Sequence, residues 1–393
     1  MKTNEKYKDA NNSTLRVRHH APNGMRRGLL GALLLAGLLM AAAPAQAQET
    51  GIGGKRSVDV MQVNLYIGAG LHPIVALDPT DPDYLTKLVS AVTGVFYEVV
   101  ASQPDVRLAG VANAIVARMP DLVTVEEGTL LRIQSPGDLI VGGNRPATNV
   151  VFDYVQILVD TLAARGAQYA VVSTSDEWDV EMPMFNLQTG TIDDLRQTDR
   201  EAILVRTDLP PGQFRVSDSQ SGHFTNVIVF PSIGLSFTRG WCSADVSIRG
   251  RDFRCICAHL EEETAPQVQA LQAQELLNGP ANANLPVMIV GDFNADPYGR
   301  DGSFAYDLFL AAGFSDAWAV LHPDNLTGGL TWGHDEYLAN PFVQFVRRID
   351  LVFYRGANFV PTLANVVDMG LDRTQPPLWA SDHAAISTEF RLR

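Results

Sequence analysis

The chain has 393 residues, of which 46% are hydrophobic, and a formal net charge of −14. This length and composition are sufficient for a sizeable buried core, which excludes a disordered or low-complexity protein. Because an acidic protein does not attract polyanions through its general field, the charge also argues against avid nucleic-acid binding. It does not exclude a nuclease, since bound divalent cations can supply positive charge locally.

The first residues have the pattern of an export signal. Arg26 and Arg27 precede an uninterrupted apolar run that reaches Met40, and Ala45-Gln46-Ala47 follows as a small-x-small cleavage pattern. The run is too short to span a bilayer comfortably, so a retained membrane anchor is the less favoured alternative. We predict a signal peptide over 1–47, with Met25 as an alternative initiator, and a secreted or periplasmic protein without a stable membrane anchor.

Removal of the signal peptide makes the protein more acidic. Residues 1–47 contain seven Lys or Arg and two acids, so residues 48–393 carry a net charge of about −19. These residues contain no repeat, no low-complexity tract and no obvious linker, and we predict a single domain over 48–393 with an insertion around 68–119. The protein is expected to be a monomer.

In chain order, the first half predicts a strand at 58–65, helices at 84–100 and 106–119, a strand at 121–126, a helix at 151–165, and strands at 169–173 and 202–206. Gln103-Pro104 separates the first two helices, and Gly166 provides a stop for the third. Leu122-Val123-Thr124-Val125 is nearly all apolar and rich in β-branched residues, as expected of a buried strand.

The second half predicts strands at 226–230, 242–248 and 254–259, a helix at 264–278, a strand at 287–290, a helix at 303–312, and strands at 349–353 and 385–391. Helices connect some of these strands, whereas others follow one another like hairpins. This alternation favours mixed sheets covered by helices on both faces over a purely parallel sheet.

The most specific motif is the apolar strand that runs into Gly291-Asp292-Phe293-Asn294. Asp292 and Asn294 project from the same face of the strand end. A carboxylate beside an amide can hold and deprotonate a water while the amide contacts a developing oxyanion. The alternative interpretation is a simple Asx turn after the strand.

Other strand ends carry polar residues of the same kind. His259 ends one strand, Asp382-His383 precedes the last strand, and Asp350 enters an apolar strand where a buried acid needs a partner. A histidine is a plausible partner for Asp350, and an ion pair with the neighbouring Arg347 or Arg348 is the alternative. The remaining two strand ends carry Asn64 and the pair Glu126 and Glu127.

Taken in chain order, from Asn64 to His383, the six motifs resemble the endonuclease/exonuclease/phosphatase superfamily, which includes pancreatic-type deoxyribonucleases, apurinic-site endonucleases, neutral sphingomyelinases and inositol polyphosphate phosphatases. The resemblance covers roughly residues 57–393. It implies an α/β fold with four layers, an α/β/β/α sandwich in which two mixed β-sheets pack face to face with helices outside.

The resemblance also implies a metal centre. Glu127 would be the principal ligand of Mg²⁺ or Mn²⁺, and Asn64 and Asp382 would complete or support the metal shell. Hard oxygen ligands with open water positions suit these ions better than zinc. The family usually has Gln-Glu where this chain has Glu126-Glu127. Glu126 therefore remains an alternative to Glu127.

The resemblance implies in-line attack of water on phosphorus. Asp292 would activate the water, and Asn294 would help to hold it. His259 and His383 would contact the phosphoryl oxygens, and Asp350 would buttress His383. A carboxylate partner for the other histidine is not obvious in the sequence, and Glu181 is a candidate.

The expected activity is metal-dependent hydrolysis of a phosphate ester in a small molecule or lipid head group. An extracellular or periplasmic nuclease is the main alternative, and a binding protein that has lost catalysis is a third. The predicted insertion contains few Lys or Arg, unlike a clamp for a phosphate backbone. The intact set of eight residues argues against loss of catalysis.

The three cysteines give no clear prediction of a disulfide. An exported protein with Cys242, Cys255 and Cys257 can form one bridge at most. If 241–248 and 253–260 form a hairpin, Cys242 lies off the direct cross-strand register of the other two. We therefore expect no bridge.

Overall fold

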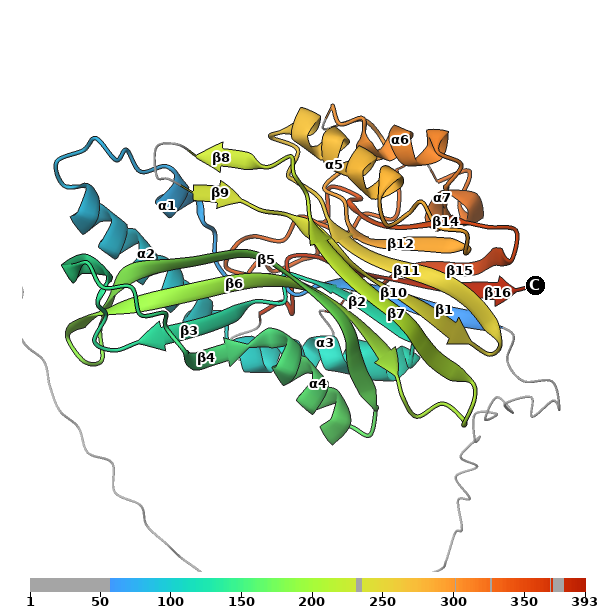
Figure 1. Cartoon of the computed structure of the whole chain (residues 1–393), viewed down its shortest axis with the longest axis horizontal. Helices are drawn as coiled ribbons and strands as arrows, with labels where there is room; N and C mark the ends of the chain where they lie inside the picture. The colour runs from blue at the N-terminus through green and yellow to red at the C-terminus, as the bar shows by residue number, and fades with distance from the viewer. Residues whose placement is uncertain (1–56, 231–234, 301, 326, 368, 370–377) are drawn as a thin grey trace, which may run out of the picture. The chain divides into compact units, whose positions relative to one another are not determined.

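Two mixed β-sheets lie at the centre of the fold (Figure 1). A computed structural model describes residues 57–230, 235–300, 302–325, 327–367, 369 and 378–393, and the predicted signal peptide lies outside the described residues. The first sheet consists of β1 (Ser57–Asn64), β2 (Leu122–Glu126), β3 (Leu130–Gln134), β4 (Asn149–Asp153), β5 (Tyr169–Asn186), β6 (Thr191–Arg206), β15 (Phe359–Val367) and β16 (Ala385–Leu392). Its order is β15-β16-β1-β2-β6-β3-β4, with β5 paired to β6.

The second sheet consists of β7 (Phe214–His223), β10 (Gly240–Ile248), β11 (Arg251–His259), β12 (Val287–Asp292), β13 (Ser315–Asp316) and β14 (Asp350–Arg355). Its order is β13-β14-β12-β11-β10-β7. The pairs β1–β2 and β11–β12 are parallel, and the other pairs among the described strands are antiparallel. A small separate sheet pairs β8 (Ile228–Phe230) with β9 (Leu235–Phe237).

Helices cover the outer faces of both large sheets. They are α1 (His72–Val75), α2 (Tyr84–Ala101), α3 (Pro104–Arg118), α4 (Tyr154–Ala164), α5 (Pro266–Asn278), α6 (Ala305–Ala311), α7 (Ala317–Leu321) and the 3₁₀ turn η1 (Leu139–Val141). One core cluster joins the first sheet to α3 and α4, and another joins the second sheet to α5 and α6 (Figure 1). A third lies between the sheets. The predicted α/β/β/α sandwich is confirmed.

The pleat of the strands determines which residues face the other sheet. In β1, Val58 and Val60 belong to the core between the sheets, whereas Met61 and Val63 pack against the helices. Alternate residues share a face, so the inward-facing row of β1 continues from Val60 to Gln62 and Asn64. The inward row therefore changes from apolar to polar towards the end of the strand, where the predicted site lies.

Several predicted boundaries were wrong. Helix α4 begins at Tyr154 rather than at residue 151, because residues 149–153 pair as β4 and Asp153 accepts a hydrogen bond from the Gln156 backbone N–H (3.1 Å) as an N-cap. The strand predicted at 169–173 continues to residue 186 as half of a long hairpin with β6. Strands β3, β7 and β15 were not predicted.

The predicted cysteine register was also wrong. Cys242 lies directly opposite Cys257, because Arg249 and Gly250 form a two-residue turn between β10 and β11. Both turn residues have positive φ (51° and 75°), as a tight hairpin turn of this kind requires. The three thiols are buried and free.

Helix α2 lies within the predicted insertion. It is the one helix of the described residues with the length and mean hydropathy that a membrane span needs. Its residues Val92, Val95, Phe96 and Val99 are buried in a core cluster with residues of β3, β5 and β6. This packing accounts for its apolar face within the fold.

Candidate active site

The polar strand ends meet at one edge of the sandwich. Asn64 is paired with Glu126 across parallel strands, and His259 with Asp292 across another parallel pair. Asp350 begins β14 opposite Asp292, because these two strands are antiparallel. The edge opens into a cleft of about 470 Å³. Six of the eight predicted residues line it, namely Glu127, His259, Asp292, Asn294, Asp382 and His383.

The other two predicted residues contact the cleft residues from behind. The side-chain amide of Asn64 donates to Glu127 Oε1 (3.0 Å) and to Asp292 Oδ2 (3.1 Å). Asp350 Oδ2 lies 2.9 Å from His383 Nδ1. Arg347 and Arg348 form ion pairs with Glu263 and Asp316 instead, so the alternative ion pair for Asp350 is not formed.

The two adjacent glutamates point to different places. Glu126 follows the inward row of β2 and is fully buried, where it accepts hydrogen bonds from Gln62 Nε2 (2.7 Å) and Cys257 Sγ (3.2 Å). Glu127 lies one residue beyond the strand with a left-handed backbone (φ 54°) and accepts a hydrogen bond from the Ile67 backbone N–H (2.9 Å). Only Glu127 of the pair lines the cleft.

The left-handed backbone recurs at Asn294, whose φ is 50°. Asn294 N–H donates to Asp292 Oδ1 (2.9 Å), so the predicted Asx turn and the paired carboxylate and amide are both present. Non-glycine residues with positive φ are uncommon and concentrate at functional sites. The position before Asp292 requires glycine, since a Cβ added to Gly291 would lie 1.9 Å from the Ala258 carbonyl oxygen.

His383 lies among three carboxylates. Besides Asp350, its Nε2 is 3.7 Å from Asp292 Oδ2 and 3.9 Å from Asp382 Oδ1. Burial alone would lower the pKa of His383, but Asp350, Asp382 and Asp292 outweigh it and raise the pKa well above the usual value. Burial and the charge of Asp350 raise the pKa of Asp292 to about 8. His383 is therefore expected to be an imidazolium at neutral pH.

His259 has the opposite electrostatic environment. Burial and the charge of Arg239 lower its pKa well below the usual value. An arginine only donates, so at the 3.0 Å contact between Arg239 Nη1 and His259 Nδ1 the imidazole accepts and its proton lies on Nε2. His259 Nε2 lies 3.3 Å from Asn294 Nδ2 and 3.6 Å from Asp292 Oδ2. The two imidazoles thus differ in protonation within one cleft.

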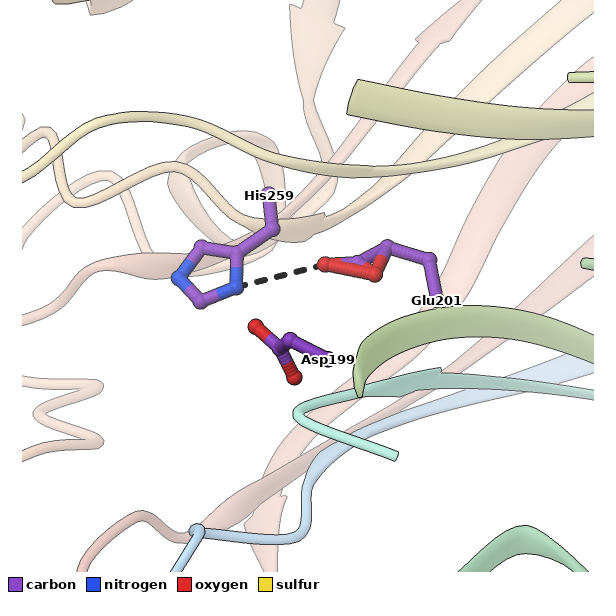
Figure 2. A group of neighbouring side chains, drawn as sticks. All are labelled: Asp199, Glu201 and His259. Atoms are coloured by element: carbon purple, nitrogen blue, oxygen red, sulfur yellow. Dashed lines mark ion pairs between the residues drawn. The ribbon is translucent and has the colours of Figure 1, made fainter. Parts of the chain in front are cut away.

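The acidic residue that lies against His259 is Glu201, not Glu181. Glu201 Oε1 lies 3.3 Å from His259 Nδ1, beside Asp199 (Figure 2). Glu181 instead accepts a hydrogen bond from the Ala147 backbone N–H (2.9 Å). The prediction failed because Glu201 belongs to the extension of β6 that was not predicted. Its signal was present, since Asp199, Glu201 and Ile203 alternate on the inward face of that strand.

Gln62 and Arg239 were also missed. Gln62 Nε2 donates to Asp350 Oδ1 (2.6 Å) as well as to Glu126, and thus connects the carboxylates of the two sheets. A polar residue on the inward row of β1 was the available signal. Arg239 lies between Asp199 Oδ2 (3.6 Å) and Glu261 Oε1 (3.9 Å), and its charge reaches His259 across the hairpin.

The site is suited to a hard cation. Two groups within the described residues bring potential ligand atoms within 4.8 Å of one another: Asp199, Glu201 and His259, and Asp292, Asp350 and His383. Neither contains Glu127 or Asp382, the carboxylates predicted as ligands, which line the same cleft. Burial, together with the charge of Glu127, raises the pKa of Asp382 to about 6.

The raised pKa of Asp382 reflects its burial and, to a lesser degree, repulsion by Glu127, and a divalent cation would offset both. Asn64 holds Glu127 and Asp292 together, and the Trp332 indole N–H donates to Asp382 Oδ2 (3.1 Å). Carboxylate oxygens held in place in this way are the ligands that Mg²⁺ and Mn²⁺ prefer. The residues therefore fit a divalent cation.

Comparison with known proteins finds similar overall folds. Among solved structures, the chain is similar to an endonuclease/exonuclease/phosphatase family protein from Leptotrichia buccalis C-1013-b, with 13% identity, a TM-score of 0.51, and coverage of 85% of this chain and 99% of that chain. It is also similar to the human Nocturnin catalytic domain with bound sulfate, with 17% identity, a TM-score of 0.47, and coverage of 86% and 94%.

A humanised D. rerio TDP2 with 14 mutations has 19% identity, a TM-score of 0.47, and coverage of 85% and 99%. At 13% identity, the similarity to the Leptotrichia buccalis structure concerns the fold alone. No protein with a curated annotation matches the sequence. A family model described as the Endonuclease/Exonuclease/phosphatase family matches residues 100–383, which is more than half of the chain. The protein therefore belongs to the endonuclease/exonuclease/phosphatase family.

Proposed function

We propose that this protein is a secreted or periplasmic phosphoesterase that uses a divalent cation, Mg²⁺ or Mn²⁺, to hydrolyse a phosphate ester of a small molecule or lipid head group. Members of the family typically act on phosphate esters. The observation that carries the proposal is the meeting of Glu127, Asp292 and Asp382 with two differently protonated imidazoles in one cleft. Such an arrangement suits attack by water on phosphorus.

The side chains of the cleft have different roles in hydrolysis. Asp292 is placed to hold the attacking water and, in its ionised form, to take the proton of that water. Its raised pKa, about 8, favours the neutral form, and a cation bound nearby would favour the ionised form. Asn294 orients that water, and His383 as an imidazolium donates to a phosphoryl oxygen as negative charge develops there. Asp350 keeps His383 in the required orientation. Neutral His259 contacts a second phosphoryl oxygen through its Nε2–H.

A cation would be held by Glu127, with Asp382 and Asn64 as supporting ligands. It would neutralise charge on the phosphoryl group and favour ionised water nearby. The cleft is otherwise acidic: its lining residues include seven Asp or Glu and one Arg, Arg239. This balance favours a small phosphate ester over a nucleic acid, and a nuclease is the second candidate.

Hydrolysis by purified residues 48–393 tests the proposal. The substrates would be bis-p-nitrophenyl phosphate, p-nitrophenyl phosphate, plasmid DNA and sphingomyelin, each with Mg²⁺, with Mn²⁺ and with EDTA. Turnover that needs metal and is lost in Asp292→Ala is expected. A steep salt dependence with DNA as the preferred substrate would favour the nuclease. Absence of turnover with every metal and substrate would contradict the phosphoesterase proposal.

A further inference from the structure

The cleft has a second, uncharged side. We propose that the substrate is a phosphate ester with an alkyl chain, and that the chain lies against an apolar wall opposite the carboxylates. This inference rests on the proposed function, because it assigns the chain to the same cleft. The apolar wall consists of Leu71, Val75, Trp178, Ile228, Phe230 and Phe237.

The wall is built from three separate segments. Leu71 precedes α1 and Val75 is its last residue, within the predicted insertion. Trp178 lies on β5, and Phe230 and Phe237 come from β8 and β9. The ring centroids of Trp178 and Phe237 are 4.9 Å apart, and those of Phe230 and Phe237 are 5.3 Å apart. These contacts fix the aromatic rings in place.

The side chains of the wall are only partly buried. All six are half-buried rather than enclosed in a core. Apolar surface that remains accessible inside a concave site costs free energy unless something covers it. Ligand sites commonly combine such apolar walls with a few polar groups that fix orientation. In this cleft, the carboxylates and imidazoles provide the polar groups.

The wall continues into an apolar recess between α2 and the β5–β6 hairpin. Leu71, Val75, Trp178, Gln197 and Phe237 line both the cleft and the recess. The recess is closed by aliphatic side chains, namely Ile74, Val92, Val95, Val180, Met182 and Leu195. Gln197 is the one polar residue among those that line it within the described part of the chain.

The apolar lining of the recess favours an apolar ligand group. No charged side chain among the described residues lines it, so a second phosphate or a sugar would lose hydrogen bonds to water and gain only Gln197 as a partner. A flexible run of methylene groups needs no such partners. Because the recess, with a volume of about 30 Å³, opens directly from the cleft that contains Asp292 and His383, one molecule can place its phosphate at these residues, its chain along the apolar wall and the end of the chain in the recess.

The experiment uses a series of alkyl 4-nitrophenyl phosphate diesters, from methyl to hexyl, at concentrations below micelle formation. Each fully buried methylene group is expected to raise kcat/KM about 4-fold until the chain covers the wall and fills the recess. Extension from methyl to butyl should therefore increase kcat/KM by roughly 60-fold if burial is complete. The methyl ester reports phosphoesterase activity that does not depend on the recess.

Two variants locate the effect. Phe237→Ser, in the wall, is expected to flatten the dependence on chain length while methyl-ester turnover shows that the variant is folded. Val229→Ser is the matched control, since Val229 is 55% exposed and lies between Ile228 and Phe230 on the other face of β8. It should keep the dependence of the unmodified protein.

The outcomes separate this inference from the proposed function. Normal turnover of the methyl ester with no dependence on chain length would overturn the alkyl-chain site and leave the phosphoesterase intact. A dependence that survives in Phe237→Ser would overturn the assignment to this wall. Tighter binding of hexylphosphonate than of methylphosphonate, measured by titration calorimetry with Mg²⁺, is expected as well, and equal binding would count against the site even if no ester were hydrolysed.

Discussion

Substitution of Arg107 tests how the cleft is held together. Arg107 lies on α3 and is 1% exposed. Its Nη1 donates to the Leu65 carbonyl (3.0 Å) and the Ala380 carbonyl (2.8 Å), its Nη2 to the Tyr66 carbonyl (3.1 Å), and its Nε to the Ser102 carbonyl (3.0 Å). The guanidinium group thus joins the segment after Asn64 to the segment that leads to Asp382.

The contacts of Arg107 permit an estimate of how far its substitution lowers the free energy of unfolding. In Arg107→Met, four buried carbonyl groups lose a charged donor, and a buried polar group left unsatisfied costs about 1–3 kcal/mol. Removal of a buried cation recovers several kcal/mol of desolvation, which offsets part of this loss. We expect the free energy of unfolding to fall by about 3–5 kcal/mol. Arg107→Lys should lie between, because an ammonium group cannot reproduce the planar set of donors.

Urea unfolding of the two Arg107 variants measures the effect. Arg165→Met is the matched control, because Arg165 is exposed at the end of α4 and should change stability by no more than about 0.5 kcal/mol. The increase in Tm on addition of Mg²⁺ should also shrink in Arg107→Met, since Asn64 and Asp382 are no longer held together. A loss below about 1 kcal/mol with a normal response to Mg²⁺ would refute the reasoning.

Three further predictions concern the carboxylates. Glu127→Gln should abolish the increase in Tm caused by Mg²⁺. Glu126→Gln should preserve this increase, because burial raises the pKa of Glu126 and already favours its neutral form. Equal responses of the two variants in a thermal-shift titration would contradict the assignment of Glu127 as the ligand. Asp350→Asn should lower the pKa of His383, lower kcat roughly 100-fold and move the basic limb of the pH–rate profile to lower pH, and an unmoved limb would show that His383 is not the acid. In EDTA, the folded protein should lose stability between about pH 4 and pH 8. The pKa of Asp292 is raised to about 8 in the folded state, so the folded protein keeps a proton that the unfolded chain releases near pH 4. The stabilisation from this proton is complete below the unfolded pKa and is lost as pH rises through the folded pKa. Denaturation midpoints across this range check the sign, and a midpoint that rises steadily with pH would contradict it.

The sequence by itself determined the local elements of the site. A buried strand followed by polar residues is a pattern within one segment, so Asp292 and Asn294 could be placed at a strand end without the fold. The same holds for Asn64, His259 and Asp350. The order of these motifs along the chain was sufficient for the family, which the family match confirms. The roles of the individual residues stay predictions.

Only the tertiary structure decided which polar groups meet. Glu201 and His259 are far apart in the sequence, and their contact depends on how β6 of one sheet lies over β11 of the other. The position of Glu127 in the cleft depends on a backbone with positive φ, and the pairing of Cys242 depends on a two-residue turn. A change of one residue in register reverses the face to which a strand residue points, and local propensity does not determine register between distant strands.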